Sequence, residues 1–245
     1  MKAMKNSILI ILVSLLSSSL LYSQDKKLLS QIEKIEVDGQ TVFLLDGEKH
    51  HGIIYENYPD TQLKARFQIS NGLREGFSEM YYKNGQLLEK LTYKNGLKDG
   101  PYLEYYENGQ LRGKTSYKND LLDGPSETYY QNGALMQKGS FTNNKQEGIV
   151  EEYYDNGILK LKGYYTNDQK NGPFEVFFPN GQLSISLTYK NEKINGISKR
   201  YYKNGQLMKI GSFKNDLKDG VFENYNTRGK LIKREVYKND VKIKE

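Results

Sequence analysis

A glycine recurs every 24 residues along most of this chain, and no insertion or deletion interrupts the period. When each unit is numbered from that glycine as position 1, position 12 is always leucine and position 20 is always asparagine. The glycines are Gly52, Gly76, Gly100, Gly124, Gly148, Gly172, Gly196 and Gly220. Such strict spacing predicts eight equal units that stack on one another, because one inserted residue would turn the faces of a strand over.

Each unit carries two turn signals. Six of the eight units have Asn-Gly at positions 9 and 10, as in Asn84 and Gly85. This dipeptide supplies the two positive φ angles of a type I′ turn, which suits a two-stranded hairpin. We therefore predict one β-hairpin per unit, with strands at positions 2–8 and 11–18 and a further reversal near position 20. A parallel β-helix with one coil per unit is the alternative fold, and the hairpin turns argue against it.

The predicted hairpin fixes which residues face each other. A two-residue turn at positions 9 and 10 places position 4 opposite position 15, and position 7 opposite position 12. Positions 4 and 15 then form pairs of opposite charge, which support this register. The pairs are Glu79 with Lys90, Glu127 with Lys138, Glu151 with Lys162, and Glu223 with Arg234. Alternation puts positions 3, 5, 7, 12, 14, 16 and 18 on the more apolar face, and positions 4, 6, 13, 15 and 17 on a wetter face.

The composition excludes several kinds of chemistry. The 245 residues include no cysteine, so disulfides, thiol nucleophiles and cysteine-based metal sites are excluded. The two histidines, His50 and His51, are neighbours that would point to opposite faces of a strand. The 36 Lys and Arg exceed the 30 Asp and Glu only modestly, which does not indicate nucleic-acid binding. Because the polar groups recur along an open surface, we expect no enzyme, no cofactor and no metal site.

The N-terminal residues 1–23 read as a secretory signal peptide. Lys2 and Lys5 precede an apolar run and a serine-rich stretch, and the run is shorter than the ~20 residues that span a bilayer. Cleavage is expected after Ser23, with Ser19 as the alternative, and a retained membrane anchor is the alternative to cleavage. We expect residues 24–51 to cap the first repeat, residues 52–243 to form eight repeats, and residues 244–245 to be a tail. Export predicts a periplasmic, outer-surface or secreted protein.

An aromatic residue at position 6 gives the wetter face a stripe of rings. Tyrosine offers a large rigid contact area and a hydroxyl, so this stripe is the candidate partner-binding site. The alternative is that these rings pack on one another and on lysine stems, as we expect of the aromatics at positions 7 and 18. The candidate residues are Tyr81, Tyr105, Tyr129, Tyr153, Phe177, Tyr201 and Tyr225.

The unit Gly-Pro-Tyr-Leu-Glu-Tyr-Tyr-Glu-Asn-Gly-Gln-Leu at residues 100–111, with Tyr-Lys-Asn-Asp-Leu-Leu-Asp-Gly at 117–124, resembles the MORN repeat variant family of bacterial proteins. Many members of that family are grouped as YwqK-like antitoxin components. The resemblance covers residues 52–243. It implies an all-β, elongated, single-layer, twisted antiparallel sheet of eight 24-residue hairpin repeats. It also implies protein or lipid binding and no catalytic residues in the repeat.

These observations lead to a main functional hypothesis and three alternatives. The main hypothesis is a non-enzymatic exported repeat scaffold that mediates protein-protein or cell-envelope binding, since a repeated surface suits an extended partner. The first alternative is an antitoxin or immunity-type protein that neutralises a cognate toxin, although a signal peptide does not suit an intracellular antitoxin. The second is an anionic lipid-binding surface built on the lysines at position 15, and the third is a passive spacer.

Overall fold

The computed structural model describes residues 26–244, and the predicted signal peptide of residues 1–23 lies outside this range. No helix in the described range has both the length and the apolar character needed to cross a bilayer. The contacts divide the chain into two compact units. The first runs to Gly100 and includes Glu107–Gly109, and the second comprises Pro101–Tyr106 and the chain from Gln110 onward.

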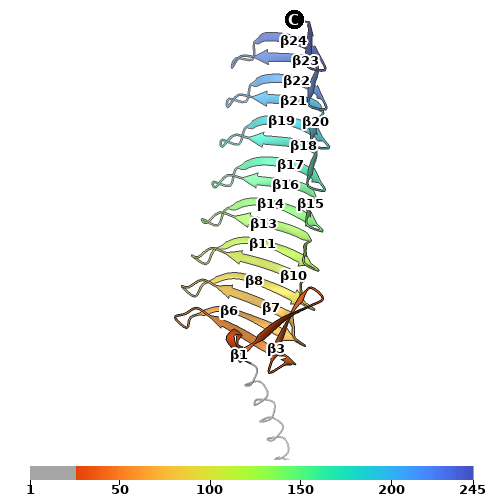
Figure 1. Cartoon of the computed structure of the whole chain (residues 1–245). Coiled ribbons are helices and arrows are strands. Elements are labelled where there is room, and N and C mark those ends of the chain that lie inside the picture. Colours follow the sequence, from red (N-terminus) through yellow and green to blue (C-terminus); the bar gives the residue numbers. More distant parts are fainter. Residues whose placement is uncertain (1–25, 245) are drawn as a thin grey trace, which may run out of the picture. The chain divides into compact units, whose positions relative to one another are not determined.

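The first unit begins with one parallel strand and continues as antiparallel hairpins (Figure 1). Its elements are β1 (Lys26–Leu28), the 3-10 turn η1 (Leu29–Gln31), β2 (Glu33–Val37), β3 (Gln40–Leu45), β4 (Glu48–Lys49), β5 (Gly52–Asn57), β6 (Leu63–Ser70), β7 (Leu73–Tyr81), β8 (Leu87–Lys94) and β9 (Leu97–Lys98). Strand β1 pairs with β5 in parallel, so the open edge of the first repeat is covered by residues 26–28.

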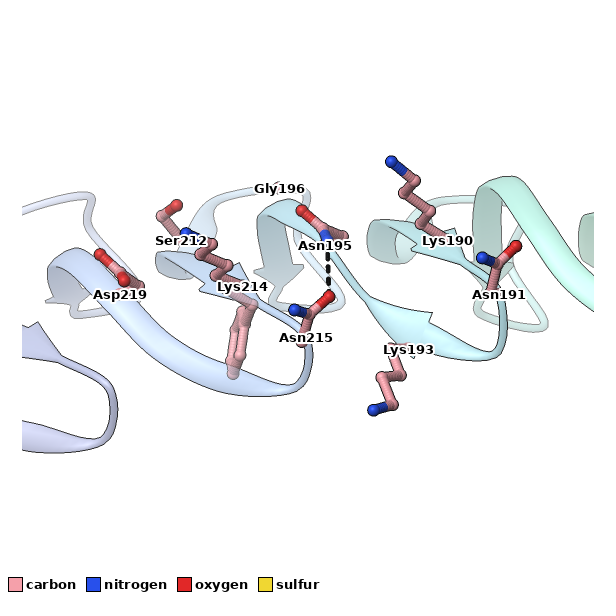
Figure 2. A pocket seen from close by; sticks show the side chains of 10 residues that line it. Lys190, Asn191, Lys193, Asn195, Gly196, Ser212, Lys214, Asn215 and Asp219 are labelled. Atoms are coloured by element: carbon pink, nitrogen blue, oxygen red, sulfur yellow. Dashed lines mark hydrogen bonds between the residues drawn. The ribbon is translucent and has the colours of Figure 1, made fainter.

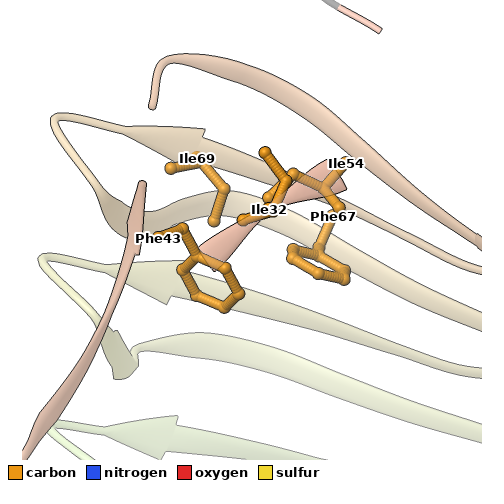
Figure 3. Close-up of a cluster of buried hydrophobic side chains, with 5 residues drawn as sticks. All are labelled: Ile32, Phe43, Ile54, Phe67 and Ile69. Atoms are coloured by element: carbon orange, nitrogen blue, oxygen red, sulfur yellow. The ribbon is translucent and has the colours of Figure 1, made fainter. Parts of the chain in front are cut away.

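The cap residues form a small second sheet of β2, β3 and β4. Phe43 of β3 donates its backbone N–H to Gly72, and its ring packs with Ile54, Phe67 and Ile69 of the repeats (Figure 3). The cap therefore adds a layer over the apolar face of the first repeats. Val37 is 45% exposed and takes no part in this core.

The second unit is a ladder of antiparallel hairpins (Figure 1). Its strands are β10 (Gly100–Tyr105), β11 (Leu111–Lys118), β12 (Leu121–Leu122), β13 (Gly124–Tyr129), β14 (Leu135–Thr142), β15 (Lys145–Gln146), β16 (Gly148–Tyr153), β17 (Leu159–Thr166), β18 (Gln169–Phe177), β19 (Leu183–Lys190), β20 (Lys193–Ile194), β21 (Gly196–Tyr201), β22 (Leu207–Lys214), β23 (Leu217–Tyr225), β24 (Leu231–Lys238) and β25 (Val241–Lys244). The prediction of an all-β antiparallel sheet of hairpin repeats is confirmed, and the parallel β-helix alternative is wrong.

The type I′ turn lies at positions 20 and 21 of each repeat, and not at positions 9 and 10 as predicted. At positions 20 and 21 both residues have positive φ, as in Asn215 (50°) and Asp216 (70°), so the two-residue type I′ turn lies here. At positions 7–11 the loop is longer. Gly85 has a positive φ of 85° but Asn84 does not, and the N–H of Gly85 donates to the carbonyl of Tyr82 at 2.9 Å. This is a three-residue loop closed by a glycine bulge.

The longer loop changes part of the predicted register. Position 4 pairs with position 15 as expected, for example Glu151 with Lys162. A β-bulge then follows position 5, so that Tyr153 at position 6 lies opposite Leu159 at position 12. The prediction that position 7 faces position 12 is therefore wrong. The first strand of each hairpin accordingly ends near position 6, and the second begins at position 12.

The apolar face is packed by residues of alternating size. Position 16 of one repeat lies beside position 3 of the next, as Gly163 beside Phe174 and Gly211 beside Phe222. Phe222 is only 2% exposed and meets Phe213 and Tyr237 edge to face, with ring centroids 5.2 and 5.3 Å apart. Large rings are thus buried in a thin sheet because glycine in the preceding repeat leaves room for them.

Candidate functional site

All seven predicted stripe residues lie at or near the end of the first strand of a hairpin, and all are half-buried. They lie on the same face as the charged residues at positions 4 and 15, as the sequence predicted. The seven are Tyr81, Tyr105, Tyr129, Tyr153, Phe177, Tyr201 and Tyr225. Two shallow pockets of about 330 and 240 Å³ are lined in part by Tyr81 and Tyr153, respectively.

Four of the stripe tyrosines are anchored by a carboxylate two residues earlier in the same strand. Tyr81 donates its hydroxyl to Glu79 at 2.7 Å, and Tyr153 donates to Glu151 at 2.7 Å. Tyr225 donates to Glu223 at 2.6 Å, and Tyr129 donates to Glu127 in the same way. The sequence signal for this contact is glutamate at position 4 followed by tyrosine at position 6. The sequence analysis treated these two positions separately and did not predict the hydrogen bond between them.

Lysines complete this arrangement from the neighbouring strands. The Glu151 carboxylate accepts from Lys138 Nζ at 2.7 Å and from Lys162 Nζ at 3.2 Å. Hydrogen bonds from Lys138 and Tyr153 lower the pKa of Glu151 to about 2. Burial raises the pKa of the Tyr153 hydroxyl, and its bond to Glu151 raises it further. At neutral pH this group is therefore a fixed carboxylate, a neutral phenol and two ammonium groups.

The other predicted stripe residues lack this arrangement. Leu103 occupies position 4 before Tyr105, and Lys199 occupies it before Tyr201. Phe177 has no hydroxyl, although Glu175 precedes it at position 4. The stripe is therefore chemically uniform at Tyr81, Tyr129, Tyr153 and Tyr225, and it is interrupted elsewhere.

The tyrosines at position 7 join one repeat to the next. The Tyr130 hydroxyl donates to the carbonyl of Tyr153 at 2.8 Å, and Tyr154 donates to Phe177 at 2.9 Å. Tyr58, Tyr106 and Tyr202 make the equivalent bond. This finding agrees with a structural role for position 7.

Phe178 is the one aromatic residue at position 7 that has no hydroxyl, and this gives a prediction with an internal control. Phe178→Tyr should raise the free energy of unfolding by about 1 kcal/mol, because the new hydroxyl can donate to the carbonyl of Tyr201. Tyr130→Phe should lower it by a similar amount, because the carbonyl of Tyr153 loses its donor. Urea unfolding of both variants checks the signs, and equal shifts in one direction would contradict the assignment.

The side chains of the asparagine and aspartate turns form hydrogen bonds to the backbone of neighbouring repeats. Asp216 accepts the N–H of Ile194 at 2.7 Å, and Asp168 accepts the N–H of Gln146 at 2.6 Å. Asn132 at position 9 accepts from Ala134 N–H and donates to the carbonyl of Asp155 in the next repeat. Within residues 26–244, no three histidine, aspartate or glutamate side chains group closely enough to hold a metal ion.

The two histidines lie in the segment that joins the cap to the first repeat. His50 is 5% exposed, and its backbone carbonyl accepts the N–H of Gly72 at 2.8 Å, whereas His51 is exposed. These contacts assign His50 to the packing of the cap on the repeats.

Together, the stacked hairpins and the recurring polar-aromatic group define a repeat scaffold. The family model for the MORN repeat variant matches seven consecutive segments of the chain: residues 74–95, 98–119, 122–143, 146–167, 170–191, 194–215 and 218–239. These matches cover more than half of the chain, so the protein belongs to the MORN repeat variant family. The repeat is generally a binding or scaffolding unit rather than a class of enzyme. A comparison with curated proteins gave no match.

Proposed function

We propose that this protein is an exported, non-enzymatic scaffold that binds an extended protein or cell-envelope partner through the face that carries position 6. The supporting observation is the recurrence of one group, tyrosine held by glutamate and lysine, at 24-residue intervals in Tyr129 and Tyr153. Each copy offers a rigid ring edge and fixed charges, and weak contacts to several copies add through effective concentration. Export through residues 1–23 to the periplasm, the outer surface or the medium is part of this proposal.

The stripe is suited to binding because its rings do not need to be ordered by the partner. The hydroxyls of Tyr129 and Tyr153 are already fixed by Glu127 and Glu151, so little side-chain freedom is lost on association. Both residues are partly exposed, and Lys138 Nζ lies 5.9 Å from the centroid of Tyr153. A partner with apolar side chains and alternating charges would match this surface.

The test is affinity capture from the native cell envelope with wild-type protein and with Tyr129→Ser/Tyr153→Ser. Tyr164→Ser is the matched control, because Tyr164 is a 44% exposed tyrosine at position 17 of the same face and so tests whether binding depends on position 6 itself. Circular dichroism first establishes that all three proteins fold. A partner retained by wild type and by the control, but lost by the double variant, would support the proposal.

Other outcomes would favour other functions. If all three proteins retain the same partners, or none, the stripe has only a structural role. Tight one-to-one binding of a toxin would favour the antitoxin hypothesis. Selective binding to anionic vesicles would favour the lipid hypothesis.

A further inference from the structure

The last two repeats differ in charge from the rest of the chain. Residues 196–243 contain 12 Lys and Arg against 5 Asp and Glu, whereas residues 24–195 contain 21 against 24. The excess positive charge of the protein is therefore concentrated in its C-terminal repeats. Charge of one sign raises the local concentration of ligands of the other sign.

Beside this segment lies the largest of the pockets described here, about 780 Å³, on the side of the two-residue turns (Figure 2). Its lining runs from Lys190 at the end of β19 to Asp219 in β23. The side chains of Lys190 and Lys214, both at position 19 of their repeats, point to the same side of it in Figure 2, while Lys193 points the other way. Lys190 and Lys214 are two strand spacings apart in the ladder, or about 10 Å.

These two lysines face a position that is acidic in other repeats but is asparagine here. Lysine at position 19 faces the last residue of the preceding repeat, as in the bond of Lys238 Nζ to both Asp219 oxygens at 3.0 and 3.1 Å. For Lys94 and Lys118 that preceding residue is also acidic, Glu75 and Asp99. For Lys190 and Lys214 it is Asn171 and Asn195. Two consecutive repeats thus have the lysine at position 19, but an asparagine in place of the carboxylate that faces it.

The remaining polar groups of the pocket do not neutralise the lysines. Asn195 Nδ2 donates to Asn215 Oδ1 at 3.1 Å, which fixes both amides at the pocket wall. Asp219 also lines the pocket, but its two oxygens are held by Lys238. Within residues 26–244, no carboxylate lies within ion-pair distance of Lys190 or Lys214. The pocket is therefore a concave surface with two unneutralised ammonium groups.

We propose that this pocket binds a soluble phosphorylated ligand, with Lys190 and Lys214 as its charged donors. Phosphate oxygens accept strong charge-assisted hydrogen bonds from ammonium groups, and two lysines about 10 Å apart suit a ligand with more than one phosphate. Ser212 and Asn215 supply neutral donors between them. This site is distinct from the position-6 stripe and goes beyond the scaffold function proposed above.

The experiment is calorimetric titration of the purified protein with inorganic tripolyphosphate at low salt. Wild type should bind it, and the affinity of Lys190→Gln/Lys214→Gln should be lower by a factor of about ten or more. The charge-matched control is Lys203→Gln/Lys230→Gln, since both lysines are exposed in loops of positions 7–11, away from the pocket. This control should retain most of the affinity.

A second variant tests the cause without removing a lysine. Asn171→Asp restores beside Lys190 the acid found at this position in other repeats and leaves the bond between Asn195 and Asn215 intact, so the fold should be kept while tripolyphosphate binding is weakened. No binding by wild type would overturn the proposal, as would equal losses in the pocket variant and the charge-matched control. Binding to vesicles of phosphatidylserine and phosphatidylcholine without binding to tripolyphosphate would also overturn it.

Discussion

Gly211→Val is expected to lower the free energy of unfolding by about 3 kcal/mol. A Cβ placed on Gly211 would lie 2.1 Å from the ring of Phe222, far inside van der Waals contact. The ring cannot easily move away, because Phe213 and Tyr237 meet it edge to face on either side. Since Gly211 does not have a positive φ, the cost arises from this contact and not from backbone strain.

Position 16 offers a matched control for that substitution. Thr115 occupies the same position in another repeat, and its Oγ1 is buried without a hydrogen-bond partner among the described residues. Thr115→Val keeps the shape and removes the unsatisfied hydroxyl, so it should raise the free energy of unfolding by about 1 kcal/mol. Valine at one register position should therefore have opposite effects in two repeats. Urea unfolding of both variants measures this, and a loss of stability in both would contradict the packing argument.

A double variant identifies Phe222 as the cause. Phe222→Ala alone should cost about 4 kcal/mol, because the ring is 2% exposed. In Gly211→Val/Phe222→Ala the added valine fills part of the space that the ring leaves. The double variant should therefore be clearly more stable than the sum of the two single effects predicts. Strict additivity would show that Gly211 and Phe222 are not coupled.

The sequence predicted the fold and part of the register because those features repeat. Glutamate at position 4 and a basic residue at position 15 identified the correct strand pairing, as in Glu151 with Lys162. The same local reasoning assigned the wrong turn. Asn-Gly at positions 9 and 10 satisfies a type I′ turn, but there the asparagine side chain of Asn132 donates to Asp155 of the next repeat. A bond between repeats is not visible within one repeat.

The candidate site was predictable in position but not in chemistry. Alternation correctly placed Tyr129 and Tyr153 on the face of the charged pairs. It did not show that their hydroxyls donate to Glu127 and Glu151, because that contact depends on side-chain direction within the strand. The pocket beside Lys190 was also missed, since it is formed by residues from consecutive repeats and by the absence of a carboxylate.

Deleting one whole repeat should have very different effects depending on which repeat is removed. Each 24-residue deletion keeps the strand register, but it creates a new contact between position 16 and position 3. Deletion of residues 148–171 places Gly139 beside Phe174, which repeats the glycine-ring contact of Gly163 with Phe174. Lys138 would also face Glu175, so a pair of opposite charges is kept. This deletion should remove only the contribution of one repeat.

Deletion of residues 196–219 has the same length and should be far more destabilising. It places Leu187 at position 16 beside Phe222 at position 3, where Gly211 normally leaves room for the ring. Two large side chains would compete for that space, so this variant should be less stable than the first by about 3 kcal/mol. Thermal and urea unfolding of the two variants, which have equal length, give the comparison directly. Equal stabilities would mean that the repeats are interchangeable and that alternation of side-chain size across their junctions does not determine the order in which they stack.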